Sequence, residues 1–418
     1  MALRDEIALG GRLALVWGGV WGIAAAGDPL ARVVAPPWRA DPYAQYRRLS
    51  GAQRSRTGAV TVASHALVSQ VLRDRRLGVR TADGSEPAPF ARSPLPAEHL
   101  VTHTFLEEDP PNHTRLRGLA RPAFGPKQIA GYRESVEKTT HRLLDDALAK
   151  PVFDLVADFA SPLPIAVISD LLGVPDVDAD TFLRYGRVLG ASLDGIKSVR
   201  HARDLRDATG ELQKLFLRLI EERTADPGPD VISTLVGALG RGELTEQELL
   251  STCELLLIAG FETTSNLIGN AVHTFAAHPD QWAALRADPS LAPAAVDEVL
   301  RYESPVQMTQ RLPHEDVEIG GVKARAGTLV ACLLGAANRD PEVFTDPDRF
   351  DISRPDSGDH LSFSSGIHYC LGAPLARLEG EVALTALAER LPELKPVGRA
   401  RWRKTVVIRG LTRYRLAR

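Results

Sequence analysis

The stretch from Thr245 to Pro279 limits the folds that are open to this chain. Thr245 and Glu248 have the spacing of a capping box, an apolar run follows, and His278-Pro279 ends it. About 30 residues in one helix would extend roughly 45 Å, enough to cross a whole domain. A helix that is apolar on several faces has to be buried. We therefore expect a mainly helical domain built around this helix.

The middle of this helix contains residue types that are unfavourable there. Gly260 is costly in a helix interior, and Glu262 would bury a carboxylate. Ala259, Phe261 and Thr263 complete the run. A local conflict of this kind marks a functional site. The structural alternative is that Thr263 bonds back to the carbonyl four residues earlier and that Glu262 is paired on a helix face.

The segment from Phe363 to Gly372 lies where a loop turns into a helix. Apolar residues recur behind it at helical spacing, at Leu375, Leu378, Val382, Leu387 and Leu391. Cys370 is therefore expected at a helix N-terminus, whose free N–H groups favour a thiolate, the form that binds metal. Gly366 and Gly372 would let the backbone approach something flat and bulky. The alternative is a buried, inert cysteine.

The loop from Phe363 to Gly372 resembles the haem-ligand loop of the cytochrome P450 family. That pattern is Phe-x-x-Gly-x-His/Arg-x-Cys-x-Gly, and every fixed position is met, at Phe363, Gly366, His368, Cys370 and Gly372. The resemblance implies a heme b cofactor (iron protoporphyrin IX) with Cys370 as the iron ligand. It also implies that the other fixed residues of the loop contact the cofactor.

The central helix also resembles the family, whose pattern there is Ala/Gly-Gly-x-Asp/Glu-Thr. The resemblance implies that Ala259 and Gly260 make room for O2 against the helix. Thr263 would hydrogen-bond the bound oxygen, and Glu262 would relay protons from solvent. These two residues are the implied catalytic pair.

Three further segments resemble family segments that hold the haem. Asp109 to Arg117 resembles the propionate-binding segment, which implies that role for His113 and Arg117; Arg311 and His368 are implied to join them. The resemblance also implies a buried charge network behind the haem loop, formed by Glu298, Arg301 and Arg349. Without the resemblance, Glu-x-x-Arg would indicate only a surface salt bridge.

The substrate pocket is the least specified part of the sequence. By resemblance it would include the loop 81–97, the segment 181–198, and the side chains of Phe261, Val306, Gln307, Met308 and Ile408. None of these positions carries a charge pattern that identifies a substrate. We expect a lipophilic small molecule, such as a natural-product intermediate or a lipid.

The resemblance implies the P450 fold: mainly α with small β-sheets, the haem between the long central helix and the cysteine loop, and a single domain over residues 31–418. It implies a monooxygenase that inserts one oxygen atom of O2 into its substrate by hydroxylation or epoxidation. The alternatives are oxidative coupling or peroxide-driven chemistry on the same scaffold, and a non-catalytic haem or ligand-binding protein.

The composition bears on partners and compartment. The net charge of −3 gives no basic field to hold nucleic acid, and three cysteines without paired spacing fit a reducing, cytoplasmic compartment.

The chain shows no dinucleotide or flavin motif and no iron–sulfur cysteine cluster. The electrons must then come from separate proteins, which the resemblance implies are a ferredoxin and its NAD(P)H-dependent reductase. Exposed basic residues could receive the ferredoxin, at Arg115, Arg121, Lys127 and Arg377; ordinary solvated charges are the alternative. We expect a monomer.

Residues 1–30 form an apolar segment with three interpretations. The run from Leu13 to Ala26 follows Arg12 and contains several glycines. It is shorter than the roughly 20 apolar residues that span a bilayer. We expect a helix that docks on the domain; a signal peptide and a membrane contact are the alternatives.

Overall fold

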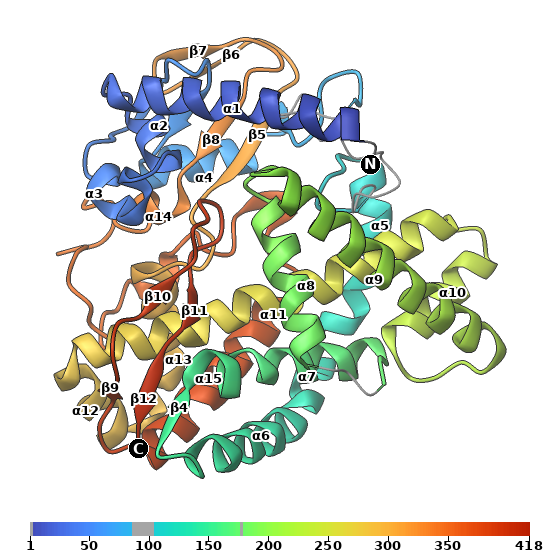
Figure 1. The fold of residues 1–418 in the computed structure, drawn as a ribbon, viewed down its shortest axis with the longest axis vertical. Coiled ribbons are helices and arrows are strands. Elements are labelled where there is room, and N and C mark those ends of the chain that lie inside the picture. Colours follow the sequence, from blue (N-terminus) through green and yellow to red (C-terminus); the bar gives the residue numbers. More distant parts are fainter. Residues whose placement is uncertain (1–2, 86–103, 176–178) are drawn as a thin grey trace.

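The computed structural model describes residues 3–85, 104–175 and 179–418. The chain is mainly helical, with small sheets gathered toward one side (Figure 1), which confirms the predicted fold class. The expected binding loop 81–97 lies outside the described residues from residue 86 onward.

The described part of the chain is built mainly from α-helices. Their bounds are α1 (Leu3–Ala25), α2 (Pro29–Val34), α3 (Pro42–Tyr46), α4 (His65–Arg73), α5 (Asn112–Ala120), α6 (Pro126–Leu148), α7 (Pro162–Leu172), α8 (Ala179–Ser192), α9 (Val199–Ala225), α10 (Val231–Gly240), α11 (Glu246–Ala277), α12 (Pro279–Ala287), α13 (Ala292–Tyr302), α14 (Leu334–Ala337) and α15 (Ala373–Arg390).

Helix α11 is the predicted central helix. It has 32 residues, begins after Thr245 with both hydrogen bonds of the capping box, and ends at His278. Figure 1 shows it crossing the middle of the helical part. Most of its side chains are buried, and it packs with α7, α8, α9 and α15 in one large hydrophobic core. The expected long buried helix is confirmed.

The strands form two small sheets and two hairpins. Their bounds are β1 (Ala52–Arg54), β2 (Val60–Val62), β3 (Leu77–Gly78), β4 (Val152–Asp154), β5 (Thr309–Pro313), β6 (Val317–Ile319), β7 (Val322–Ala324), β8 (Val330–Cys332), β9 (Lys395–Pro396), β10 (Arg401–Trp402), β11 (Leu411–Arg413) and β12 (Arg415–Ala417). One sheet has the order β1-β2-β8-β5-β3, in which only β2 and β8 are parallel. The other has the order β4-β12-β9, and β6–β7 and β10–β11 are hairpins.

The tip of the β10–β11 hairpin is irregular. Of residues 406–411, only Leu411 belongs to a strand. Ile408 makes a single bridge to Val306, and the Gln307 N–H donates to the carbonyl of Val407 at 2.8 Å. The run is therefore a buried turn that packs on the segment before β5.

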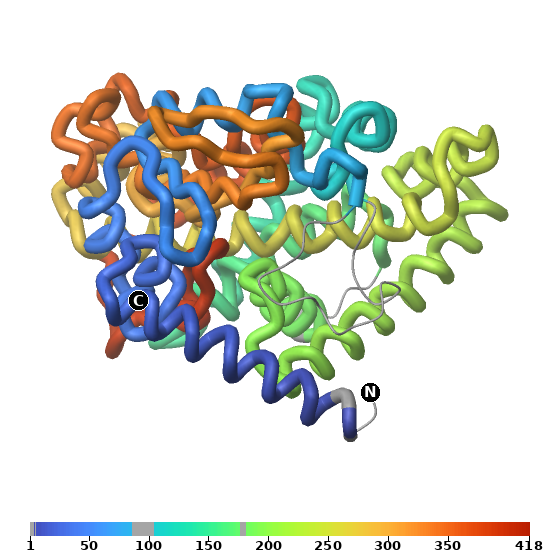
Figure 2. Tube along the Cα trace, turned by 90° about the horizontal axis from the view of Figure 1, so that it is seen from above, coloured from blue at the N-terminus to red at the C-terminus, as the bar shows by residue number. Residues whose placement is uncertain are grey.

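Helix α1 lies along one edge of the domain (Figure 2). Leu9 and Leu13 are buried in the core, and Glu6 pairs with Arg203 of α9. Among the described residues, the stretch Glu6–Ala25 is the helix long and apolar enough to cross a membrane, with a mean hydropathy of 1.4. Only 17% of this stretch is buried, so its outer face is left to solvent.

Candidate functional site

Cys370 lies at the start of α15. Its N–H donates to the carbonyl of Phe363 at 2.9 Å, which closes the loop. The backbone N–H groups of Gly372 and Ala373 donate to its sulfur. Burial raises the pKa of the thiol, while these two N–H groups and the charge of Arg117 oppose that rise. The sulfur belongs to a partly exposed residue, so it is an accessible ligand atom that a cation would turn into a thiolate.

The two glycines of the cysteine loop differ in how much space surrounds them. Gly366 has a φ of +69°, and a Cβ there would lie 2.3 Å from the carbonyl oxygen of Leu72 at the end of α4. Any side chain would push the loop away from α4. A Cβ on Gly372 would meet nothing closer than 3.8 Å. Close approach to α4, and not only to a cofactor, explains Gly366.

A group of buried polar atoms without partners faces this loop. The rings of His113 on α5 and His368 in the loop lie 4.5 Å apart between centroids. Among the residues that the structure describes, no hydrogen bond of ordinary geometry is made by either ring nitrogen of His113, by Nε2 of His368 or by Nη2 of Arg311. Burial lowers the pKa of both histidines, with the charge of Arg311 contributing to a value of about 3 for His368. Uncompensated buried donors of this kind are rare and point to a missing acceptor.

Arg117 lies on the same helix face as His113. Its Nη2 donates to the carbonyl of Tyr369, next to Cys370, at 2.5 Å. Its guanidinium also lies 6.0 Å from the ring centroid of Phe105. The structure thus brings all four predicted propionate residues to one side of the cysteine loop.

The centre of α11 contains an accessible stripe in an otherwise buried helix. Between residues 249 and 272, exposure is confined to Leu255, Ile258, Ala259, Gly260 and Thr263. The hydroxyl of Thr263 donates to the carbonyl of Ala259 at 3.0 Å. Open space therefore lies beside the helix at the predicted oxygen-binding residues.

Gly260 of this stripe and the adjacent Phe261 both pack against neighbouring helices. A Cβ on Gly260 would lie 2.6 Å from Ile168, so close packing against α7 already requires this glycine, and its predicted role in making room for O2 stays a prediction. Phe261 is 1% exposed and fills the space above Gly186 of α8. Its ring packs between α11 and α8 and adds almost no accessible surface beside the stripe, and its place in the substrate pocket stays a prediction.

Glu262 is paired, as the structural alternative foresaw. Its Oε1 lies 2.7 Å from Nη1 of Arg403, and both side chains are almost fully buried. Arg403 also donates to the side chain of Asn266 at 3.2 Å. Burial raises the pKa of Glu262, while the charge of Arg403 opposes this. The carboxylate is held by the β10–β11 hairpin, a partner that no local pattern indicated.

The remaining predicted pocket residues are held in different ways. Gln307 is 1% exposed, and its amide bonds to the hydroxyls of Tyr43 and Tyr46 and to the carbonyl of Ser304. It therefore belongs to a buried polar network rather than to an open pocket. Val306 and Met308 keep partial exposure, and Ile408 is buried.

The charge network behind the loop is built on a fully buried pair. Arg301 donates to both oxygens of Glu298, at 2.7 and 2.8 Å, and to the carbonyls of Asn338, Pro347 and Arg349. The Arg349 side chain is 65% exposed and pairs with Asp351, so its predicted place in the network is wrong. Arg354 is the third member, with its Nε 3.5 Å from Glu298. Arg349 contributes only its carbonyl because its side chain faces solvent.

A family model described as Cytochrome P450 matches residues 51–392 of this chain. The chain belongs to the cytochrome P450 family. Cytochrome P450 107B1 of Saccharopolyspora erythraea is 46% identical over 312 residues, which cover 73% of this chain and 75% of that protein. The 6-deoxyerythronolide B hydroxylase of the same organism is 42% identical over 308 residues, which cover 72% and 75%. The crystal structure of myxobacterial cytochrome P450 CYP267B1 in complex with myristic acid has a TM-score of 0.85 at 34% identity and covers 92% of this chain and 98% of that chain.

The residues of this P450 fit the haem iron of the family. Nη2 of Arg311 and one ring nitrogen of each of His113 and His368 can donate to anionic oxygens, which haem propionates would supply. The sulfur of Cys370 is the soft anionic ligand that haem iron takes in this family. The chain is thus an oxidoreductase of the oxygen-incorporating P450 type.

Sequence reasoning missed Arg354, Arg403 and Tyr43. Each acts through a partner more than 50 residues away: Glu298, Glu262 and Gln307, respectively. The spacing of residues along the sequence indicates contacts within one helix or one strand. No signal in the sequence therefore pointed to these long-range pairs.

Proposed function

We propose that this P450 is a monooxygenase with heme b held by Cys370, which takes its electrons from a ferredoxin and an NAD(P)H-dependent reductase. The observation that supports it best is the group of unpartnered buried donors around the cysteine loop, together with the open stripe on α11. The test is turnover of a lipophilic substrate with surrogate ferredoxin and reductase. Failure of any oxygenated product to form, with haem bound, would exclude it.

When bound, the haem iron supplies the activation of O2 and the transfer of one oxygen atom. The chain's residues have separate tasks. His113, Arg117, Arg311 and His368 bind the propionates, and the Gly372 and Ala373 N–H groups hold the sulfur. Thr263 offers a hydroxyl on the open side, and Glu262 can hold or release a proton because burial raises its pKa.

The substrate we propose is lipophilic and resembles a natural-product intermediate or a fatty acid. The names of the relatives support it, since one hydroxylates 6-deoxyerythronolide B and a solved neighbour holds myristic acid. The accessible stripe on α11 is also largely apolar, with Leu255, Ile258 and Ala259. A spectral binding screen with macrolide precursors and fatty acids would test this directly.

The face that would receive ferredoxin is less basic than the sequence suggests. Arg115 pairs with Glu248 at 2.5 Å, and Arg377 pairs with Asp297 at 2.8 Å. Arg121 and Lys127 remain exposed. We therefore place the electrostatic part of ferredoxin recognition on Arg121 and Lys127.

Thr263→Ala should uncouple electron use from product formation. The exposed hydroxyl is lost, so we expect product per NAD(P)H consumed to fall by about 100-fold, at the lower end of the range for one positioned proton-transfer group, while O2 consumption persists. Thr264→Ala is the matched control, because Thr264 makes the same back-bond to Gly260 at 3.2 Å but is buried. Equal uncoupling in both variants would assign the effect to helix packing.

We further propose a cytoplasmic protein that touches membranes only peripherally, through α1. The support is its outer face, on which Ile7, Leu15 and Trp21 are 68%, 79% and 52% exposed. Apolar and Trp side chains on one helix face favour the lipid interface.

The double variant Leu15→Ser with Trp21→Ser should lower the bound fraction in a vesicle co-sedimentation assay severalfold. Each change removes most of an apolar side chain that would leave water. Val152→Ser is the control, since Val152 in β4 is also exposed but lies far from α1. No binding by the unmodified protein would leave α1 as a docked helix only.

A further inference from the structure

The C-terminal segment has a charge that contrasts with the rest of the chain. Residues 395–418 contain nine Lys and Arg and no Asp or Glu, although the whole chain carries 50 basic against 53 acidic residues. Two of these basic groups are neutralised at short range, Arg403 by Glu262 and Arg409 by Glu303. Both of those pairs lie toward the active-site end of the hairpin. The excess positive charge is therefore concentrated at the other end.

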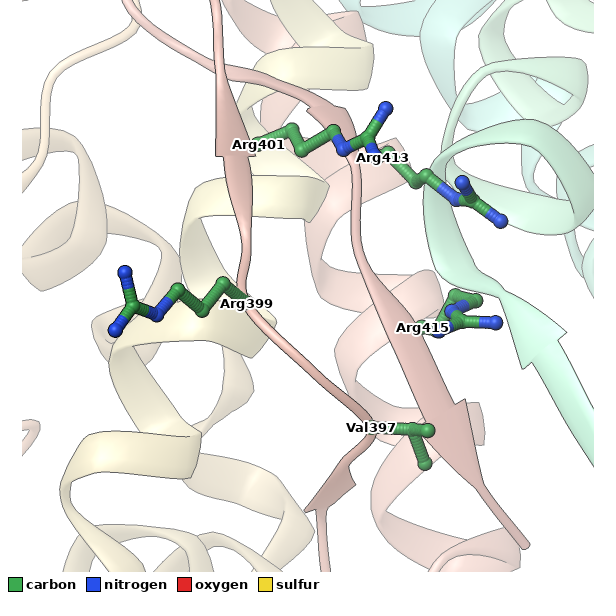
Figure 3. A pocket seen from close by; sticks show the side chains of 5 residues that line it. All are labelled: Val397, Arg399, Arg401, Arg413 and Arg415. Carbon is green, nitrogen blue, oxygen red and sulfur yellow. The ribbon is translucent and has the colours of Figure 1, made fainter.

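That end contains a pocket of about 180 Å³ lined by Val397 and four arginines, Arg399, Arg401, Arg413 and Arg415. Figure 3 shows Arg401 of β10, Arg413 of β11 and Arg415 of β12 extending to the same side. Arg399 points to the opposite side, so its stem and not its charge faces the other three. All four side chains belong to exposed residues.

The three converging arginines have few acidic partners. Asp154 of β4 lies 3.5 Å from Nε of Arg413 and is the cross-strand neighbour of Arg415. The same carboxylate already accepts the N–H groups of Val156 and Tyr414. Among the described residues, Arg401 and Arg415 have no carboxylate within salt-bridge distance. One shared carboxylate thus faces three guanidinium groups.

The strand register places like charges directly opposite each other. Arg401 pairs with Arg413 across β10 and β11. Directly opposed like charges destabilise an antiparallel pair. A local conflict of this kind, compensated only in part by Asp154, is expected where a ligand supplies the remaining compensation.

We propose that this arginine pocket binds a multiply charged phosphate-type oxyanion. Guanidinium groups match such oxygens with paired N–H donors, and several of them around one small volume favour a compact dianion. The volume is below the roughly 300 Å³ at which pockets for drug-sized ligands begin. The anion is either free in solution or the headgroup of a lipid, and the chemistry of recognition is the same in both cases.

Calorimetric titration of the haem-loaded protein with inorganic pyrophosphate at low ionic strength tests the site. We expect a dissociation constant below about 1 mM. The double variant Arg401→Gln with Arg413→Gln should weaken binding by at least about tenfold, because two charge-assisted contacts are lost. A parallel arm measures co-sedimentation with phosphatidic acid vesicles, relative to phosphatidylcholine vesicles.

The control is the double variant Lys404→Gln with Arg418→Gln, which removes the same charge from exposed positions outside this pocket. It should change affinity less than about threefold, as expected for distant screened charges. An unchanged haem spectrum in both variants verifies the fold. Loss of pyrophosphate binding in the pocket variant alone supports a free anion, and loss of vesicle binding alone supports a headgroup. No binding in either arm, or an equal loss of binding in both variants, would overturn the proposal.

Discussion

Cys370→Ser should abolish the red-shifted absorption band of the reduced CO complex and bring turnover to background. The hydroxyl of serine does not form the soft anionic ligand that the iron needs, and the electron donation of the thiolate is lost. The haem should still bind weakly, because His113, His368 and Arg311 keep their unpartnered donors for its propionates. Absorption spectra of the reduced CO complex, with haem content measured separately, give the result.

Cys332→Ala is the matched control for this prediction. Cys332 in β8 is fully buried, and burial raises its pKa to about 12, so it is an inert thiol. The red-shifted band should remain in this variant. A band that persists in Cys370→Ser would remove the basis for the assigned ligand and, with it, for the proposed monooxygenase.

Arg301→Leu should lower the free energy of unfolding by about 3–5 kcal/mol, because it leaves the buried charge of Glu298 without its main partner. Arg301 makes five hydrogen bonds, two to Glu298 and three to backbone carbonyls that lead into the haem loop. Arg354 at 3.5 Å and the Asp351 N–H at 2.9 Å compensate Glu298 only in part. Urea unfolding of the haem-loaded protein, followed by fluorescence, measures the change.

The comparison with Arg349→Leu and Arg354→Leu decides the third member of the network. The Arg349 side chain is exposed, so its loss should change stability by less than about 0.5 kcal/mol. The Arg354 side chain is only 6% exposed, so its substitution should lower the free energy of unfolding clearly more than that of Arg349. An equal loss of unfolding free energy in Arg349→Leu and Arg301→Leu would contradict a network in which Arg301 is buried and Arg349 is exposed.

Contacts between side chains that lie far apart in the sequence could not be predicted from the sequence. The motif at Asp346 to Phe350 suggested Arg349 because it matches the family segment, yet the chain turns there and Asp346 has a φ of +47°. The guanidinium that reaches Glu298 comes from Arg354, a few residues later. Gly260 shows the same limit, because the spacing revealed a special residue but Ile168 on another helix explains it.

The sequence by itself determined the central helix and the cysteine at a helix start, and the family pattern in it singled out the four residues that the fold gathers beside the cysteine loop. These features depend on hydrophobic periodicity, capping and residue type, which act within one element or carry a family pattern. Only the tertiary structure decided which side chains face open space, how Glu262 is paired, and where the excess positive charge of the C-terminus gathers. Those facts depend on which distant segments pack together, and neither periodicity nor spacing along one element encodes that packing.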